Sequence, residues 1–294
     1  MAKVVIAGGT GFIGKAVARQ LKRDDFEPVI LGRGSNADVV WDAKSLGEWT
    51  KCLEGAEAVI NLTGSPITQP WTAENRKNIL ESRIESARVI GQAIQRADRP
   101  PAVWINASAI GYYGDRGDEL LTETSSAGTG FLSEVCQAWE EALFVGDSPA
   151  VRAAVRIGIV LGRDGGALGP LVPLTRAFLG GAQGDGNQWM SWILDSDLAW
   201  TFSHIVKQRE SGVWNGVGPS PVRNRDFMHA LRSQLGRPWS PPAPKFALEV
   251  AAKLGGPDPS VLLSSMRVVP QRLMDAGALF TGRDLKQTLA TLGL

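Results

Sequence analysis

The stretch VVIAGGTGFIGKAVARQL, Val4–Leu21, joins an apolar run to a helix-forming segment through a cluster of glycines. The β-branched run predicts a buried strand, and the residues after the glycines predict a helix whose first free amides face the turn. Gly8, Gly11 and Gly14 have the spacing G-x-x-G-x-x-G, while Gly9 with the last two has the spacing G-x-G-x-x-G. Backbone amides without side chains let pyrophosphate oxygens approach a helix N-terminus. The stretch therefore predicts a turn that binds the phosphates of a dinucleotide.

The first half of the chain continues this alternation of strand and helix. Further apolar runs that predict strands lie at Pro28–Leu31, Val39–Trp41, Ala58–Leu62, Val103–Asn106 and Val155–Leu161. Helical patterns lie between several of them, at Ser45–Leu53, Thr72–Ala97 and Phe131–Val145. Continuous apolar strands separated by amphipathic helices indicate a parallel sheet covered on both faces. The expected fold is α/β, with a doubly wound parallel sheet of the Rossmann type.

After Gly162 the character of the chain changes, because glycine and proline become frequent and the helical patterns become shorter. These shorter patterns lie at Asn224–Leu235, Phe246–Leu254, Gln271–Ala276 and Leu285–Leu292. We therefore expect a dinucleotide-binding domain in residues 1–165 and a smaller substrate lobe in residues 166–294, partly interleaved with the first. In this second part Gln188, Trp189 and Trp192 lie close together, where they either line a substrate cleft or cap the core.

Composition excludes several classes of function. The chain has 294 residues and a formal net charge of +1, and no stretch gathers Lys and Arg into a basic stripe, so neither nucleic acid nor a membrane surface is an expected partner. Two cysteines, Cys52 and Cys136, and two histidines, His204 and His229, have no metal-ligand spacing. No apolar run has the length of a membrane helix, and the N-terminus does not resemble a signal peptide. We expect a cytoplasmic protein with a small-molecule substrate; the sequence does not indicate an oligomeric state.

The end of the second strand predicts which dinucleotide is bound. An NAD site usually has an acidic residue there, which binds the ribose hydroxyls. Here the strand runs into Gly32 and Arg33, and no carboxylate lies between Glu27 and Asp38. A guanidinium can bind a 2′-phosphate through two charge-assisted hydrogen bonds. The pattern favours NADP(H); the alternative is that Arg33 is only a solvated loop residue.

Four motifs together resemble the extended, epimerase-like form of the short-chain dehydrogenase/reductase superfamily. They are GGTGFIG (Gly8–Gly14), NLTG (Asn61–Gly64), NASAIGYYG (Asn106–Gly114) and VRIGIVLG (Val155–Gly162). The segments GDGNQWMSWI and VVPQRLMDAGALF extend the resemblance to a subgroup known as epimerase family proteins, sometimes labelled cell-division inhibitors. The resemblance covers nearly the whole chain and implies an NAD-dependent epimerase/dehydratase-like fold with a bound dinucleotide.

The expected NADP(H) contacts follow from the glycine motif, the second strand and this resemblance. They comprise Gly8, Thr10, Gly11, Phe12, Ile13, Gly14, Arg33, Leu62, Thr63, Gly64, Arg83, Ser108 and Ile159.

The chain departs from the superfamily in its catalytic residues. The resemblance implies a Tyr-x-x-x-Lys dyad on the helix after the fifth strand, but Leu132 and Cys136 occupy the two places. A free tyrosine has a pKa of about 10, so it is a poor base without a neighbouring cation. Tyr113, in the Tyr-Gly pair after the fifth strand, and Ser108 are the candidate catalytic residues. The alternative for Tyr113 is a role in shaping the turn or stacking on a ligand.

Arg83 occupies the place at which the resemblance implies an asparagine. On the helical pattern Thr72–Ala97 it shares a face with apolar residues such as Ile79 and Ile90. An unpaired charge on a buried stripe is costly. Arg83 therefore either contacts cofactor phosphate, ribose or an acidic substrate, or extends its guanidinium to solvent at the edge of the stripe.

Two functions follow from these observations. The first is an NADP(H)-dependent oxidoreductase or epimerase-like enzyme that acts on a small molecule, with an anion among the candidates, and lacks the usual dyad. The second is a catalytically silent regulatory or sensor protein that binds NADPH.

Overall fold

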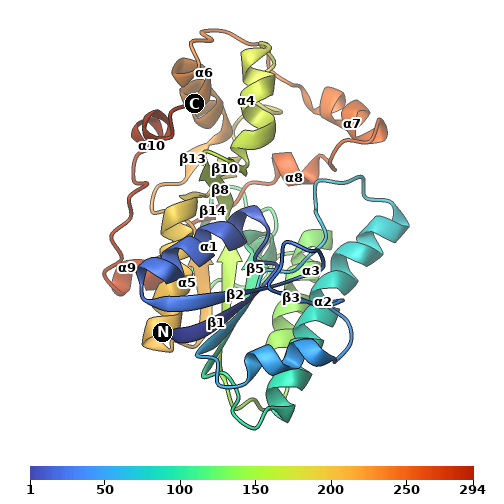
Figure 1. Cartoon of the computed structure of the whole chain (residues 1–294). Helices are drawn as coiled ribbons and strands as arrows, with labels where there is room; N and C mark the ends of the chain where they lie inside the picture. Colours follow the sequence, from blue (N-terminus) through green and yellow to red (C-terminus); the bar gives the residue numbers. More distant parts are fainter.

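A parallel sheet of seven strands forms the larger part of the computed structural model, which describes residues 1–294 (Figure 1). In spatial order the strands are β12 (Gly212–Gly216), β7 (Val151–Ile157), β5 (Val103–Ala109), β4 (Ala58–Asn61), β1 (Ala2–Ala7), β2 (Phe26–Gly32) and β3 (Val39–Val40). The central strands are buried on both faces, which explains their continuous apolar sequences. This confirms the doubly wound α/β fold that the sequence predicts.

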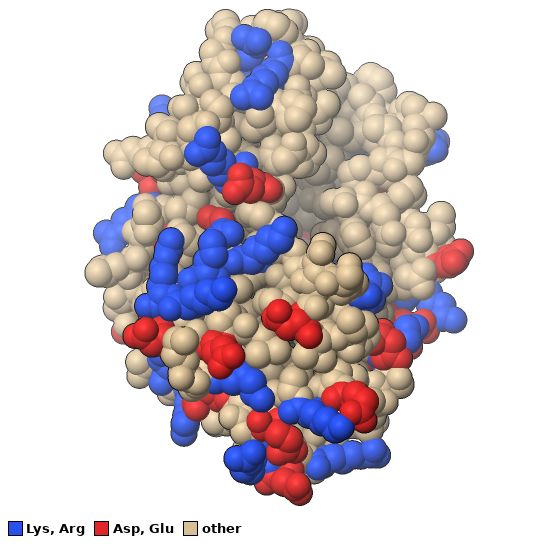
Figure 2. All heavy atoms as spheres, in the orientation of Figure 1, with Lys and Arg blue, Asp and Glu red and all other residues tan.

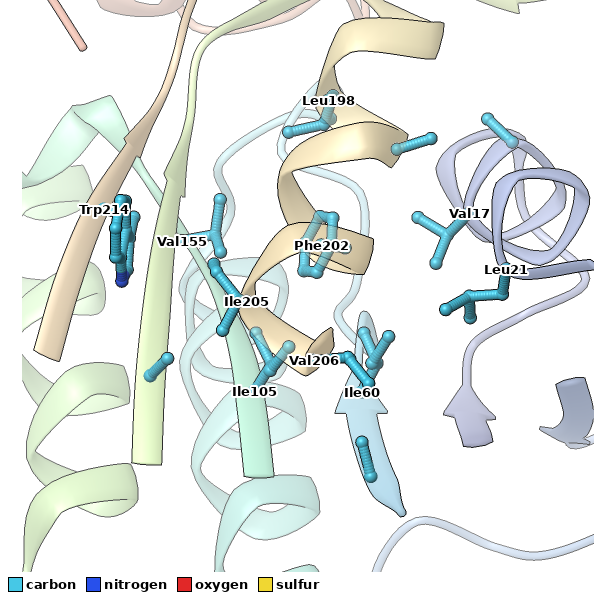
Figure 3. Close-up of a cluster of buried hydrophobic side chains, with 14 of the residues drawn as sticks. Val17, Leu21, Ile60, Ile105, Val155, Leu198, Phe202, Ile205, Val206 and Trp214 are labelled. Carbon is cyan, nitrogen blue, oxygen red and sulfur yellow. The ribbon is translucent and has the colours of Figure 1, made fainter. Parts of the chain in front are cut away.

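Helices cover both faces of the sheet. One face carries α1 (Phe12–Arg23) and α5 (Asp195–Gln208), and the other carries α2 (Ala73–Arg96) and α3 (Phe131–Phe144). Figure 3 shows the first of these layers, where side chains of α1 and α5, such as Leu21 and Phe202, point toward each other and toward the sheet. The 3-10 helix η1 (Glu48–Leu53) adds Trp49 to the second layer.

The smaller part lies at the carboxyl ends of the large sheet. It contains the strands β8 (Ile159–Gly162), β9 (Gly165–Gly166) and β11 (Trp192–Leu194), and the paired strands β10 (Trp189–Met190) and β13 (Val222–Arg223). Its helices are α4 (Leu168–Arg176), α6 (Asn224–Gln234), α7 (Lys245–Lys253), α8 (Ser260–Leu263) and α10 (Leu285–Thr291). A separate apolar core around Trp192, Phe227 and Leu289 joins β8, β10, β11 and β13 to α4, α6 and α10, whereas α7 and α8 have no buried residue.

Four short elements connect the two parts. The 3-10 helix η2 (Ile110–Tyr113) follows β5, β6 (Leu120–Leu121) pairs with β14 (Arg267–Val268), and α9 (Gln271–Asp275) packs against β12. The large sheet thus takes its outer strand β12, and one covering helix, α5, from the second half of the chain. A boundary after residue 165 consequently does not separate two contiguous units.

The run Val155–Leu161, expected as one strand, forms the end of β7 and most of β8, with a break at Gly158. A Cβ atom at Gly158 would lie 2.5 Å from the carbonyl oxygen of Ser191. Only glycine allows this close approach of two backbones, at the point where the chain passes from the large sheet into the smaller part.

Charged side chains gather on the outer surface of α1. The exposed residues there are Lys15, Arg19, Lys22 and Arg23, and the region of α1 is blue in Figure 2. Two of them lie in the last turn of the helix, where cations stabilise the negative end of the helix dipole. None of the helices in the structure combines the length and the apolarity that crossing a bilayer requires.

Candidate functional site

The three glycines of the first turn have different structural tasks. Gly8 has a φ of +81°, which disfavours any residue with a side chain. A Cβ atom at Gly14 would lie 2.5 Å from Cα of Gly9, so Gly14 permits the close contact between α1 and the preceding turn. Gly11 is exposed, and its Cβ atom would meet only the carbonyl oxygen of Gly8, at 3.4 Å. Gly11 therefore keeps the entrance to the helix N-terminus open.

The loop after β4 lies directly against this turn. A Cβ atom at Gly8 would lie 3.1 Å from the carbonyl carbon of Leu62. The Asn61 side chain accepts a hydrogen bond from the Thr63 amide at 3.1 Å, which shapes the loop as it leaves the strand. The Thr63 hydroxyl is buried and has no hydrogen-bond partner within the protein. Two predicted cofactor segments thus meet where β1 and β4 diverge, which is the usual position for a ligand in this fold.

Arg33 and Thr10 are both exposed beside the end of β2. Arg33 follows Gly32, the last residue of that strand, and makes no ion pair with any acidic residue. A Cβ atom at Gly32 would lie 3.6 Å from the Thr10 methyl carbon, so Thr10 and the strand end are neighbours. The guanidinium of Arg33 is therefore available to a ligand at the outer end of the glycine turn.

Other predicted cofactor residues have packing roles that the sequence did not indicate. The Phe12 ring lies so close to the turn between β8 and β9 that a Cβ atom at Gly162 or Gly165 would come within 2.6 Å or 2.7 Å of it. Phe12 thereby anchors the glycine turn to the smaller part. Ile13 is half-buried against the core under α1. Ile159, at the start of β8, borders the cleft described next.

A cleft of about 450 Å³ separates the smaller part from the carboxyl ends of β5 and β7. Its walls come from the loop before α2, from η2, from the first turns of α3, and from α4, α8 and β10 of the smaller part. Arg83, Asp115 and Cys136 are the ionisable side chains that border it. Figure 2 shows a hollow between the upper segments in which the visible atoms are mostly uncharged.

Leu132 and Cys136, at the two places where the resemblance implies the dyad, both border this cleft. Burial raises the pKa of the Cys136 thiol to about 12, and the neighbouring Glu140 acts in the same direction. The thiol therefore stays protonated at neutral pH and does not replace the lysine as a cation. Neither Leu132 nor Cys136 therefore offers an acid or a base at neutral pH.

Tyr113, predicted as a catalytic residue, is completely buried. Its hydroxyl lies 2.7 Å from Oδ1 of Asn215 and 2.9 Å from the carbonyl oxygen of Thr122, and it accepts a hydrogen bond from Nη1 of Arg156 at 2.9 Å. Burial raises the pKa of Tyr113, although Arg156 acts in the opposite direction. Tyr113 does not border the cleft. Its catalytic role stays a prediction, and these contacts favour a structural one.

Ser108 belongs to the same buried network. Its hydroxyl donates to Oε1 of Glu140 at 2.7 Å, and Glu140 forms a two-armed ion pair with Arg156, at 2.8 Å for each arm. The Arg156 guanidinium also lies 3.3 Å from the centroid of the Tyr112 ring. The network joins β5, η2, α3 and β7 beneath the cleft, and Ser108 does not border the cleft itself. Its catalytic and cofactor roles likewise stay predictions.

Arg83, on α2, borders the cleft, and its role as a cofactor or substrate contact stays a prediction. Its Nη1 donates to the carbonyl oxygens of Ser65 at 3.0 Å and Ile79 at 2.8 Å, and its guanidinium lies 5.0 Å from the centroid of the Trp139 ring. A Cβ atom at Gly64 would lie 2.9 Å from the guanidinium carbon. Burial lowers the pKa of Arg83, and no carboxylate lies within 4.0 Å of it. Arg83 is thus a cation without a counter-ion, and it lies between the Leu62–Gly64 loop and the cleft.

Several cleft residues were not found from the sequence. Trp71 and Phe131 form an edge-to-face pair with their ring centroids 4.9 Å apart, although 59 positions separate them in the chain and no local pattern links them. Of the residues Gln188, Trp189 and Trp192, which the sequence places together, only Trp189 borders the cleft. Gln188 donates to the carbonyl oxygens of Gln183 and Leu262, both at 3.0 Å, and Trp192 lies in the core of the smaller part.

The NAD dependent epimerase/dehydratase family matches residues 4–132 of this chain. Over 98% of the chain, it is 35% identical to an Arabidopsis thaliana protein named epimerase family protein SDR39U1 homolog, chloroplastic, covering 86% of that relative. Over the same share it is 32% identical to the Homo sapiens epimerase family protein SDR39U1, which it covers completely.

Solved structures extend this similarity to the fold. The crystal structure of human epimerase family protein SDR39U1 (isoform2) with NADPH matches 99% of the chain and 98% of its own, at 30% identity and a TM-score of 0.89. A nucleoside-diphosphate sugar epimerase from Corynebacterium glutamicum matches 99% of this chain and 58% of its own, at 32% identity and a TM-score of 0.80. This chain therefore belongs to the epimerase family proteins of the SDR39U1 type, an atypical branch of the short-chain dehydrogenases/reductases.

Proposed function

We propose that the chain is an NADP(H)-dependent oxidoreductase, or an epimerase-like enzyme, that acts on a small molecule bound in the cleft. The observation that carries the proposal is the meeting of the Gly8–Gly14 turn and the Leu62–Gly64 loop beside that cleft. Both segments offer backbone with little side-chain obstruction, as a pyrophosphate requires. The NADPH in the crystal structure of the human relative supports the same cofactor for this chain.

Arg33 is the residue that would distinguish NADP(H) from NAD(H) in this proposal. It is exposed at the end of β2, where an acidic residue would repel a 2′-phosphate. The unpaired guanidinium can instead bind that phosphate with charge-assisted hydrogen bonds.

NADPH, when bound, supplies a hydride. The residues of the chain contribute a cleft with mainly apolar walls and a guanidinium, Arg83, that stabilises negative charge on a substrate oxygen. Because Tyr113 and Ser108 do not border the cleft, we expect the proton to come from solvent and not from a side chain of the dyad type. Orienting two reactants in one site supplies about 7–11 kcal/mol, so turnover without a positioned acid is chemically reasonable.

Direct titration of the purified chain with NADPH and NADH tests the proposal. Arg33→Ala should weaken the binding of NADPH by about tenfold or more and the binding of NADH by less than about twofold, because the 2′-phosphate loses a charged hydrogen-bonding partner. Arg88→Ala removes an exposed arginine of α2 and serves as the matched control. An equal loss of affinity for both coenzymes would show that Arg33 does not bind the 2′-phosphate. If neither coenzyme binds, the proposal as a whole is rejected.

The absent dyad favours a second candidate, a regulatory protein that binds NADPH without turnover. Incubation with NADPH and a panel of aldehydes, quinones and keto-sugars, followed by absorbance of the reduced nicotinamide, separates the two. Oxidation of NADPH with any member supports the enzyme. Tight NADPH binding without oxidation, together with a ligand-dependent change in self-association, supports the regulator.

A further inference from the structure

The walls of the cleft are mainly apolar, and their aromatic side chains are held in place. The Trp71–Phe131 pair is covered by the guanidinium of Arg76, which lies 4.0 Å from the centroid of the Phe131 ring. In the smaller part Trp189 donates through Nε1 to Asp118 at 3.0 Å. The guanidiniums of Arg223 and Arg267 lie 4.2 Å and 4.6 Å from the centroid of the Trp189 ring. Fixed aromatic rings of this kind suit flat, apolar ligands, with which they can stack.

The charge of the cleft sets an upper limit on the charge of its ligand. Among the lining residues Arg83 is the only cation, Asp115 is exposed, and Cys136 is neutral at ordinary pH. A nucleotide sugar would bring a diphosphate with two negative charges into this space. Arg83 can neutralise one of them. The guanidiniums of Arg76, Arg223 and Arg267 lie over the lining aromatic rings, 4.0–4.6 Å from their centroids, and would have to leave those rings to reach the other charge. A charge left unpaired in apolar surroundings is costly.

Arg83 can accept one oxygen-bearing group. Its Nη1 is occupied by the carbonyl oxygens of Ser65 and Ile79, whereas Nε and Nη2 donate to nothing within the protein. A guanidinium has five N–H groups, so three of them remain for a ligand. Two of these lie on adjacent nitrogens, in the arrangement that binds a carboxylate or carbonyl oxygen.

We propose that the cleft binds a flat, largely apolar molecule with a single carboxylate or carbonyl group, which Arg83 binds, and that it does not take nucleotide sugars. This inference deepens the proposed function and relies on it only for the presence of NADPH next to the cleft. In this proposal the similarity to the nucleoside-diphosphate sugar epimerase from Corynebacterium glutamicum does not extend to the ligand of the cleft.

Calorimetric titration with two probes tests the inference: 2-naphthoate, a flat aromatic carboxylate, and UDP-glucose, a nucleotide sugar. Each is added to the full chain with and without saturating NADPH, and NADPH binding is measured separately. We expect 2-naphthoate to bind with a Kd of about 1 mM or lower and UDP-glucose to give no binding heat in the same range. Failure of NADPH to bind would count against the proposed function alone, because the probes are also titrated without it.

Three variants locate the bound probe. Arg83→Gln should weaken 2-naphthoate at least about tenfold, since the charged donor is lost. Val261→Glu places a negative charge on the α8 wall of the cleft and should weaken the binding of the 2-naphthoate anion similarly. Because Val261 is half-exposed, this change does not disturb the core. Arg88→Gln, an exposed change on the same helix as Arg83, should leave the affinity within about twofold.

Three results would overturn the inference: UDP-glucose binding more tightly than 2-naphthoate, no binding of 2-naphthoate at all, or unchanged affinity in both cleft variants. Weaker NADPH binding in Arg83→Gln with unchanged 2-naphthoate binding would assign Arg83 to the coenzyme, and it too would overturn the inference. Thermal unfolding of each variant shows that the chain is folded before it is titrated.

Discussion

Gly11 and Gly14 lie three positions apart in the chain, but only Gly11 has free space where a side chain would lie. A side chain at Gly14 would overlap the backbone of Gly9, whereas a side chain at Gly11 would enter the open space at the N-terminus of α1. The sequence motif predicts both glycines but does not distinguish packing from ligand access. The distinction depends on the distance between two backbones.

The same substitution at the two glycines should therefore have opposite effects. Gly11→Val should leave the thermal midpoint within a few degrees and abolish NADPH binding, because Gly11 has a φ of −73° that valine tolerates. Gly14→Val should lower the midpoint severely, because its Cβ would lie 2.5 Å from Cα of Gly9. Circular dichroism and NADPH titration check the pair. Full NADPH affinity in a folded Gly11→Val protein would contradict the assignment of the turn.

Tyr113 illustrates what the sequence cannot provide. Its position after β5 is recognisable from the Tyr-Gly pair, but its hydroxyl partners Thr122, Arg156 and Asn215 lie up to 102 positions away in the chain. A tyrosine that borders a cleft and one that is buried beneath it have the same local sequence. The structural network was for this reason not predictable, although the helix that contributes Glu140, α3, was.

Tyr113→Phe decides between the structural and the catalytic hypotheses. We expect the free energy of unfolding to fall by about 1–3 kcal/mol, because buried partners of the hydroxyl are left unsatisfied. NADPH affinity, and any turnover per folded molecule, should remain nearly unchanged. Urea unfolding and coenzyme titration measure these quantities. A loss of turnover greater than tenfold in the folded variant would restore Tyr113 as a catalytic residue.

At the scale of elements, the central strands and the four helices of the first half were predictable, because each has a continuous apolar run or an apolar stripe. Several elements of the second half were not, α5 among them, and two of these elements illustrate the reason. The helix α4 contains Pro170 and Pro173, which resemble loop residues in the sequence. The strand β12 is five residues long with a glycine at each end, and its partner β7 lies about 60 positions earlier. Long-range pairing and not local propensity determines that strand.

The contact between α1 and α5 includes a polar link. Asp24, at the C-terminal end of α1, accepts hydrogen bonds from Ser203 at 2.6 Å and Gln20 at 2.8 Å, and it forms an ion pair with Lys207. Burial alone would raise the pKa of Asp24, but the hydrogen bonds from Lys207, Ser203 and Gln20 outweigh it, so the pKa is lowered. The ionised carboxylate consequently stabilises the folded state.

A carboxyl group with a lowered folded pKa adds stability above its unfolded pKa, and that stability is lost as the pH falls through the folded value. Asp24→Asn should therefore lower the free energy of unfolding at pH 7 by about 1 kcal/mol, and the difference from the parent chain should shrink between pH 5 and pH 3. Urea unfolding across this range is the measurement. Asp25→Asn, at the exposed neighbouring position, is the control. A difference that does not depend on pH would reject the ionic link.

At the scale of the whole molecule, the cleft exists only because the two parts are placed against each other. Its lining residues come from segments as far apart as Ile67 and Met266. The sequence predicts a lobe that shapes a pocket, but the identity of its walls depends on how α4, α8 and β10 lie over the sheet. Arg83 was an exception, because a charge on an apolar helix face is visible without a structure.

The interleaving of the two parts predicts that the first of them does not fold alone. A chain of residues 1–165 lacks β12 and α5, so one edge of β7 and the apolar surface under α5 would be exposed. We expect this fragment to aggregate or to unfold without a cooperative transition. The full chain should unfold in a single cooperative transition. Thermal unfolding followed by circular dichroism measures both. A fragment with a sharp transition and full NADPH affinity would show that the sheet is independent of its outer strand.

The position of β12 also has a consequence for the newly made protein. During synthesis the ribosome must release the chain as far as Gly216 before the large sheet receives its last strand. Until then β7 presents an unpaired edge to the other polypeptides in the cell. We therefore expect the nascent chain to be prone to aggregation until about three quarters of the 294 residues have been made, and to need the protection of chaperones during that time.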